Sequence, residues 1–204
     1  MGEPLLRVEG LRKEYRRGFP QRLVTFSLEA DLTAPEPAII GVMGPNGSGK
    51  TTLFELITGS NAPSGGRVLV AGHDIHRVRY RERDRLAIHY HQSYQVRRFK
   101  RSVPSFMLAP AGNDYPLVHL FDEPQFNTQD GYIGFMLEFF RKLRGAGRLV
   151  FLCLHPTEPY HLDILRETCE RYVFVNRGRL TEAASLDALS ADPAVREYLG
   201  RLAS

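Results

Sequence analysis

A glycine-rich turn between an apolar run and a helical pattern constrains the fold of this chain more than any other feature. Residues 38–43 (AIIGVM) are apolar without alternation, as expected for a strand buried on both faces of a parallel sheet. The turn GPNGSGKT follows at residues 44–51, and apolar residues then recur with helical spacing from Leu53 until Gly59. The turn matches GxxxxGK[ST] in its required strand–turn–helix setting and therefore predicts a phosphate-binding loop.

The residue types in this loop explain why it suits phosphate. Glycines let successive backbone N–H groups wrap an anion without a Cβ clash, and the start of the helix adds partial positive charge. Lys50 can reach the β- and γ-phosphates of a nucleotide, and the Thr51 hydroxyl can ligate magnesium. The residues expected to bind the nucleotide here are Gly44, Pro45, Asn46, Gly47, Ser48, Gly49, Lys50, Thr51 and Thr52.

A second element places an acidic pair after a strand. Residues 117–121 (LVHLF) are a strand pattern that leads directly into Asp122 and Glu123. A carboxylate at this position lies at the carboxyl edge of the sheet, where open α/β sheets bind their ligands. Asp122 can hold magnesium there, and Glu123 can orient and deprotonate an attacking water.

The remaining patterns alternate strands with helices, which predicts an α/β fold with a mostly parallel sheet. We find no internal repeat and no low-complexity linker, so we expect one domain over residues 1–204. Asp130 and the Asp192-Pro193 pair are candidate helix starts, and Ile133, Met136, Leu137 and Phe140 share one helical face. The other predicted strands are residues 5–9, 23–30, 66–71, 87–91, 149–154 and 172–175, with a helix around 158–170.

Composition excludes a disordered, collagen-like or disulfide-scaffold chain. The chain has 204 residues, of which 43% are hydrophobic and 25% charged, as in soluble globular proteins. No apolar run approaches the roughly 18 residues of a spanning helix, and the first residues do not form a secretory signal. We therefore expect any membrane role to come through a partner. Cys153 and Cys169 lack metal-ligand spacing and are expected to be small buried residues; His73, His76, His89 and His91 also show no metal pattern.

Beyond these patterns, residues 4–190 resemble an ATP-binding cassette (ABC) ATPase subunit. LLRVEGLRKEYRRG is similar to the family's first strand and A-loop, and GPNGSGKTTLFELITG to its Walker A segment. IHYHQ resembles the Q-loop, HLFDEP the end of Walker B, and NTQD the D-loop with Asp130 retained. FLCLHPTEP resembles the switch strand, and CERYVFVNRGRL the closing hairpin.

The resemblance implies a P-loop NTPase fold, with an ABC-type RecA-like core and an N-terminal antiparallel β segment. It implies ATP and Mg²⁺ as cofactors, with Tyr15 stacked on adenine. Gln92 would sense the γ-phosphate and share the metal with Thr51 and Asp122. The catalytic groups that the resemblance implies are Glu123, His155, Gln92 and Lys50.

One departure from the family is large. The family inserts a helical subdomain between the Q-loop and Walker B, ending in a Leu-Ser-Gly-Gly-Gln signature that completes the partner's ATP site. Here the whole interval is residues 93–115, without Ser-Gly-Gly. We expect the helical subdomain and the signature to be deleted, which puts symmetric ATP hydrolysis in doubt but not ATP binding.

A basic segment flanks this deletion. The chain carries a net charge of +4, and residues 77–101 hold nine Lys or Arg against Glu82 and Asp84. The segment is compatible with a solvated face, with docking to a permease or another protein, or with nucleic acid. Its aromatic residues are Tyr80, Tyr90, Tyr94 and Phe99.

We therefore expect an ATP-binding and ATP-hydrolysing subunit of an ABC complex, a transporter with separate permease subunits. The expected partners are a second ABC subunit, in a homo- or heterodimer, and an integral-membrane permease that holds the chain on the cytoplasmic face; nucleic acid is the less favoured partner. Two alternatives remain open: a nucleotide-gated regulatory subunit with little turnover, and a soluble nucleic-acid-associated ATPase. Hydrolysis is then expected to require a partner that supplies the signature.

Overall fold

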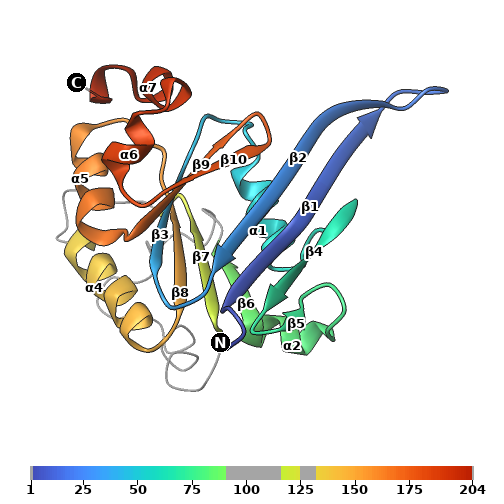
Figure 1. Cartoon of the computed structure of the whole chain (residues 1–204), viewed down its shortest axis with the longest axis horizontal. Coiled ribbons are helices and arrows are strands. Elements are labelled where there is room, and N and C mark those ends of the chain that lie inside the picture. Colours follow the sequence, from blue (N-terminus) through green and yellow to red (C-terminus); the bar gives the residue numbers. More distant parts are fainter. Residues whose placement is uncertain (1, 91–115, 125–131, 204) are drawn as a thin grey trace.

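The structure is a computed structural model that describes residues 2–90, 116–124 and 132–203 (Figure 1). Two sheets and the helices packed on them make up the fold. The strands are β1 (Leu6–Arg17), β2 (Leu23–Ala34), β3 (Ile39–Met43), β4 (Gly65–Val70), β5 (His73–Asp74), β6 (Ala87–Tyr90), β7 (Val118–Asp122), β8 (Leu149–Cys153), β9 (Arg171–Asn176) and β10 (Arg179–Ala183). The helices are α1 (Lys50–Ile57), α2 (Tyr80–Leu86), α4 (Tyr132–Gly145), α5 (Pro159–Thr168), α6 (Leu186–Ser190), α7 (Pro193–Leu199) and a 3-10 turn (Gly200–Ala203).

The larger sheet has six strands in the order β10-β9-β3-β8-β7-β6. All neighbours run parallel except β10, which pairs antiparallel with β9. The strands β3, β7 and β8 are buried on both faces, which is why β3 and β8 have no polar residue and no alternation. Because Asp122 is in register with Cys153, the residues that follow β7 and β8 meet at one carboxyl edge.

The smaller sheet is antiparallel, in the order β2-β1-β4-β5. β1 and β2 form a long hairpin whose tip projects beyond the rest of the molecule (Figure 1). Both strands are longer than the sequence predicts. β1 extends because its polar, arginine-rich residues near the tip remain paired, as in Arg17 with Leu23, and β2 extends at the base of the hairpin, where Ala34 pairs with Leu6. In β2 every second residue from Leu28 to Ala34 is buried, the alternation of a strand with one covered face.

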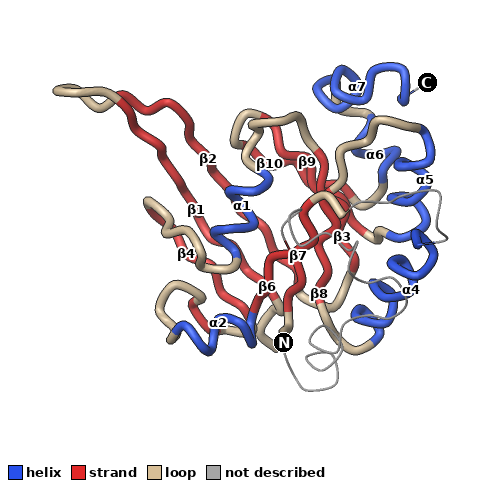
Figure 2. Tube along the Cα trace, turned by 180° about the vertical axis from the view of Figure 1, so that it is seen from behind, coloured by secondary structure: helices blue, strands red, loops and turns tan. Residues whose placement is uncertain are grey.

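The six-stranded sheet separates two hydrophobic cores, and side chains of β3 pack alternately into one core and the other. Ile40 and Val42 pack into the core shared with α1 and the antiparallel sheet. Ile39 and Met43 pack into the core formed with α4, α5, α6 and α7 on the other face. Figure 2 shows these layers from behind, with α4 and α5 together on one side of the sheet.

The expected α/β fold with a mostly parallel sheet is confirmed, as are buried Cys153 and Cys169. Asp192 caps α7 as predicted, because its side chain accepts a 2.8 Å hydrogen bond from the backbone N–H of Ala194. The sequence patterns did not indicate β5, α2 or α6, all short elements, and β10 was expected only as the second half of the closing hairpin. Among the described residues, we find no helix with the length and apolar character that a membrane crossing requires.

Candidate nucleotide-binding site

The loop between β3 and α1 adopts a backbone path that needs glycine at both of its ends. Gly44 has φ 150°, and an added Cβ would collide with the carbonyl oxygen of Val175. Gly49 has φ 113°, and an added Cβ would lie 2.8 Å from Leu28 Cδ1 and 2.9 Å from a ring carbon of Phe26. Left-handed backbone and close neighbours together exclude other residue types at these positions without strain.

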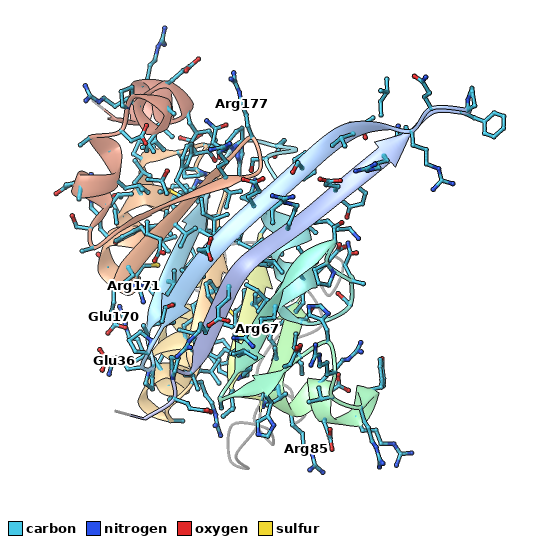
Figure 3. The ribbon with its side chains drawn as sticks, turned by 45° about the vertical axis from the view of Figure 1, so that its right-hand side comes forward. Glu36, Arg67, Arg85, Glu170, Arg171 and Arg177 are labelled. Carbon is cyan, nitrogen blue, oxygen red and sulfur yellow. The ribbon has the colours of Figure 1, made fainter. Side chains whose placement is uncertain are left out.

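The turn between β9 and β10 braces this loop. The N–H of Gly178 donates a 2.9 Å hydrogen bond to the carbonyl of Ser48, and its carbonyl accepts one of 2.7 Å from Glu29 in β2. Figure 3 shows Arg177 of the same turn pointing outward from the body of the protein. The loop is thus tied to both sheets.

Lys50 is the first residue of α1 and is only 6% exposed. Its ammonium donates hydrogen bonds of 2.7 Å to the carbonyl of Gly44 and 3.0 Å to that of Pro45. These bonds occupy two of its three donors and hold the positive charge inside the loop. The charge therefore lies where a bound phosphate would enter.

Thr51 and Asp122 bring two oxygen groups together at the edge of the parallel sheet. The Thr51 hydroxyl donates a 2.9 Å hydrogen bond to Asp122 Oδ2, and His89 Nε2 lies 3.4 Å from the same oxygen. Burial acts to raise the pKa of Asp122, but its hydrogen bonds with His89 and Thr51 outweigh burial, so that the pKa is lowered. An ionised carboxylate beside a hydroxyl is the hard oxygen set that Mg²⁺ prefers when phosphates complete its coordination.

Glu123 follows β7 with φ 50°, a left-handed conformation that is uncommon for residues other than glycine. Its backbone N–H donates a 3.0 Å hydrogen bond to the carbonyl of Cys153 at the end of β8. This bond turns the chain at the sheet edge, directly after Asp122.

His155 lies two residues beyond β8, at the same sheet edge. Its Nδ1 is 2.9 Å from the hydroxyl of Tyr198 in α7. The segment after it is ordered by His161 of α5, whose Nδ1 accepts hydrogen bonds of 3.2 Å from the backbone N–H groups of Thr157 and Glu158. Tyr198 and His161 therefore stabilise residues 155–158 from two sides. This is the segment that resembles the family's switch region.

A cavity of about 330 Å³ opens beside the loop, within the size range of small-molecule sites. Tyr15 of β1 and Phe26 of β2 stand opposite each other in the hairpin, with ring centroids 6.1 Å apart. The Tyr15 hydroxyl accepts a 2.8 Å hydrogen bond from the Asn61 amide. The cavity is lined by Tyr15, Phe26, Asn46, Gly47, Gly49, Lys50, Thr51 and Thr52.

The structure thus brings most of the predicted site residues to one region: the loop, Asp122, Glu123 and His155 at the sheet edge, and Tyr15 at the cavity. Gln92, Asp130 and the interval 93–115 lie outside the described residues. Among the described residues, no group of three or more His, Cys, Asp or Glu could hold a metal ion.

Three residues of the site were missed in the sequence: Phe26, His89 and Tyr198. Phe26 could have been found from the pairing of the two predicted N-terminal strands, because Tyr15 opposes it. Nothing in the sequence pointed to His89 or Tyr198, because the position of each side chain depends on packing between elements that are distant in the chain. Tyr90, which the sequence analysis counted among the aromatics of the basic segment, instead stacks on Phe121 with ring centroids 4.4 Å apart.

Comparison with known proteins gives one family. A family model described as ABC transporter matches residues 28–106. An uncharacterized ABC transporter ATP-binding protein of Nostoc sp. is 29% identical over 230 residues, which cover 88% of this chain and 66% of the relative. The lipoprotein-releasing system ATP-binding protein LolD of Chromohalobacter salexigens is 42% identical over 73 residues, 36% of this chain and 30% of that protein. The chain thus spans less than two thirds of these relatives.

Solved structures give the same fold. A nucleotide-free ATP-binding cassette from an ABC transporter superposes with a TM-score of 0.69 at 17% identity, covering 95% of this chain and 98% of that one. A dimeric cassette, MJ0796 in a post-hydrolysis state with ADP and Pi, has a TM-score of 0.66 at 16% identity, covering 88% of this chain and 98% of that one. The Nostoc alignment is longer than this chain of 204 residues, so that relative has residues that this chain lacks.

Proposed function

We propose that this chain, which is an ABC-type ATPase subunit, binds ATP and Mg²⁺ in the cavity between the β1–β2 hairpin and the loop at residues 44–52. One observation carries the proposal: the hydroxyl of Thr51 and the carboxylate of Asp122 meet at 2.9 Å beside the lysine-bearing loop. This contact between two distant segments supports an anion-binding loop and a metal-binding oxygen pair in one site.

In this proposal each group has one task. The backbone N–H groups of the loop and the ammonium of Lys50 bind the phosphates. Thr51 and Asp122 would hold the metal, and the family resemblance adds Gln92 to them. Bound Mg²⁺ would neutralise charge on the phosphate oxygens. Tyr15 and Phe26 would contact the adenine at the other end of the cavity.

Two further side chains serve hydrolysis. Glu123 would orient the attacking water and accept its proton, because its carboxylate follows immediately after the metal-binding Asp122. His155 would donate a hydrogen bond to the γ-phosphate from the adjacent strand end. Both stand at the carboxyl edge where β7 and β8 terminate.

The short interval between Gln92 and β7 determines how the subunit works. It contains no Ser-Gly-Gly, so two copies of this chain would each leave the other's γ-phosphate without the signature's donors. Losing such preorganised donors costs on the order of 10²–10³ in rate. We infer a heterodimer, in which ATP bound to this chain meets the signature of a complete ABC subunit, whereas the partner's ATP meets none.

The setting proposed for this heterodimer is a membrane transporter, with the chain on the cytoplasmic face and a separate permease as partner. Relatives named as transporter or lipoprotein-releasing subunits support this setting. The basic segment, with α2 at its start, would be a docking surface for the permease.

Steady-state hydrolysis by the purified chain tests this proposal. We expect the chain alone to bind ATP but to turn it over about 10²–10³ times more slowly than complete cassettes do. The Glu123→Gln variant should lower this residual rate further, whereas the control Glu138→Gln, on the exposed side of α4, should not. If the chain alone hydrolyses ATP at an ordinary rate and Glu123→Gln abolishes this activity, the heterodimer proposal is wrong.

A further inference from the structure

Helix α7 brings a tyrosine into the candidate nucleotide site. The hydroxyl of Tyr198 lies 2.9 Å from Nδ1 of His155, and the two ring centroids are 5.7 Å apart. The Tyr198 ring also packs 5.5 Å from that of Phe174 in β9. Val195 and Leu199, on the same face of α7, are buried in the core, so the helix cannot shift without loss of core packing.

The surroundings of the Tyr198 hydroxyl indicate whether it donates its hydrogen to Nδ1 of His155 or accepts one from it. Burial raises the pKa of Tyr198 far above its ordinary value, although the backbone of Gly44 acts in the opposite direction, so the hydroxyl keeps its hydrogen. Nδ1 of His155, at 2.9 Å, is the partner to which the hydroxyl can donate it.

A neutral imidazole that accepts at Nδ1 carries its hydrogen on Nε2. We infer that Tyr198 is a positioning residue: it holds His155 in the Nε2–H form and so gives the ring a donor for the γ-phosphate. The first half of this inference, the Nε2–H form of His155, is independent of the proposed function. The second half, the donor for the γ-phosphate, rests on it.

This arrangement connects three separate parts of the fold. Gly44 begins the phosphate-binding loop, His155 follows β8, and Tyr198 belongs to α7. The Tyr198 hydroxyl hydrogen-bonds with His155 and lies beside the backbone of Gly44. The orientation of His155 therefore depends on a side chain that also borders the phosphate-binding loop.

Nitrogen NMR of the nucleotide-free chain, with ¹⁵N-labelled histidine, tests the first half directly. The chain has seven histidines, and the signals of His155 are identified by their loss in His155→Gln. We expect Nε2 to carry the hydrogen and Nδ1 to show the shift of a hydrogen-bonded acceptor. A hydrogen on Nδ1 in the wild type would overturn the inference.

Tyr198→Phe keeps the ring and removes only the hydroxyl. We expect the Nδ1 signal of His155 to move toward that of an unbonded nitrogen. The matched control is Tyr172→Phe, which also removes a buried hydroxyl, but one that donates to the carbonyls of Leu165 and Cys169. This control should leave both nitrogens of His155 unchanged. An unchanged Nδ1 signal in Tyr198→Phe would contradict the assignment.

Nucleotide affinities test the second half. Tyr198→Phe should weaken ATP binding about two- to tenfold more than ADP binding, the range expected for one neutral hydrogen bond. In a His155→Ala background the same substitution should add nothing, because Tyr198 acts through His155. An equal loss in both backgrounds would mean a merely structural role. If the wild type binds no ATP, the proposed function fails, while the NMR result still decides the role of Tyr198.

Discussion

Thr51 and Asp122 lie 71 positions apart in the chain, yet the hydroxyl of one donates a 2.9 Å hydrogen bond to the carboxylate of the other. This contact joins the start of α1 to the end of β7, across the carboxyl edge of the parallel sheet. Both oxygens belong to groups that Mg²⁺ coordinates readily. The pair is therefore the part of the site that should make nucleotide binding depend on the metal.

Asp122→Asn should remove most of this metal dependence, because the amide keeps the shape of the side chain and loses its charge. We expect the ratio of ATP affinity with Mg²⁺ to that with EDTA to fall about tenfold or more, as for loss of a bond to a charged group. Asp187→Asn, at an exposed position of α6, is the control and should keep the wild-type ratio. An unchanged ratio in Asp122→Asn would place the metal elsewhere.

Tyr15 should contribute to ATP binding through the base alone. Stacking of an aromatic side chain on a base is worth about 1–3 kcal/mol, so Tyr15→Ala should weaken ATP binding by about fivefold to over a hundredfold. Affinity for inorganic triphosphate, which has no base, should not change. Phe19→Ala is the control, since Phe19 lies 98% exposed at the hairpin tip. Equal losses for ATP and triphosphate would show that Tyr15 acts on the loop and not on adenine.

Gly49→Ala tests the backbone argument for the phosphate-binding loop. Alanine would have to adopt φ 113° with its Cβ against Leu28 and Phe26, and should lower the free energy of unfolding by about 1–2 kcal/mol. Gly134→Ala, within α4 and without a neighbour inside 4 Å of the added Cβ, should instead raise it by about 0.5–1 kcal/mol. Urea denaturation measures both. If Gly49→Ala is as stable as the wild type, the conformation of the loop is not the one described.

His119 in β7 should make the fold sensitive to mild acid. The side chain is fully buried, and burial lowers its pKa from 6.5 to about 4, although the backbone of Pro116 acts in the opposite direction. Between pH 6.5 and 4 the unfolded chain binds a proton here that the folded chain does not. Stability due to this group is therefore complete above pH 6.5 and decreases as the pH falls, by up to about 2 kcal/mol at pH 5.

Replacement of this histidine isolates its effect. His119→Phe keeps a ring beside Tyr90 and Phe121 and should lose less stability between pH 7.5 and pH 5 than the wild type does. Urea titrations at both pH values give, for each protein, the difference in the free energy of unfolding between pH 7.5 and pH 5. Any effect of the substitution that is the same at both pH values cancels in this difference. Equal differences for the two proteins would show that His119 does not titrate as described.

Local sequence patterns predict the parts of this site that depend on residues adjacent in the chain. The glycine spacing of the loop and the apolar strand before Asp122 identify both segments, and the parallel arrangement of the strands then brings Asp122 near the loop. The alternation in β2 predicts which face is covered, and Phe26 could have been inferred from the pairing of the hairpin. These features need only strand periods and strand order.

Other contacts could not be predicted, because they depend on how distant elements pack. Tyr198 has the helical spacing of a core residue, with Val195 and Leu199, and nothing in that pattern distinguishes a contact with His155 from ordinary burial. His89 belongs to a strand whose alternation does not show which neighbour its ring meets. The contact with Asp122 arises only because β6 and β7 are adjacent and parallel.

Calorimetric titration of the full chain with ATP and Mg²⁺ tests the central claim most directly. The wild type should bind one nucleotide, and Lys50→Ala should weaken binding about tenfold or more, because the ammonium that would contact the phosphates is lost. Lys142→Ala, at an exposed position of α4, should bind as the wild type does. Equal ATP affinity in the wild type and Lys50→Ala would contradict the assignment of this loop as the phosphate-binding site.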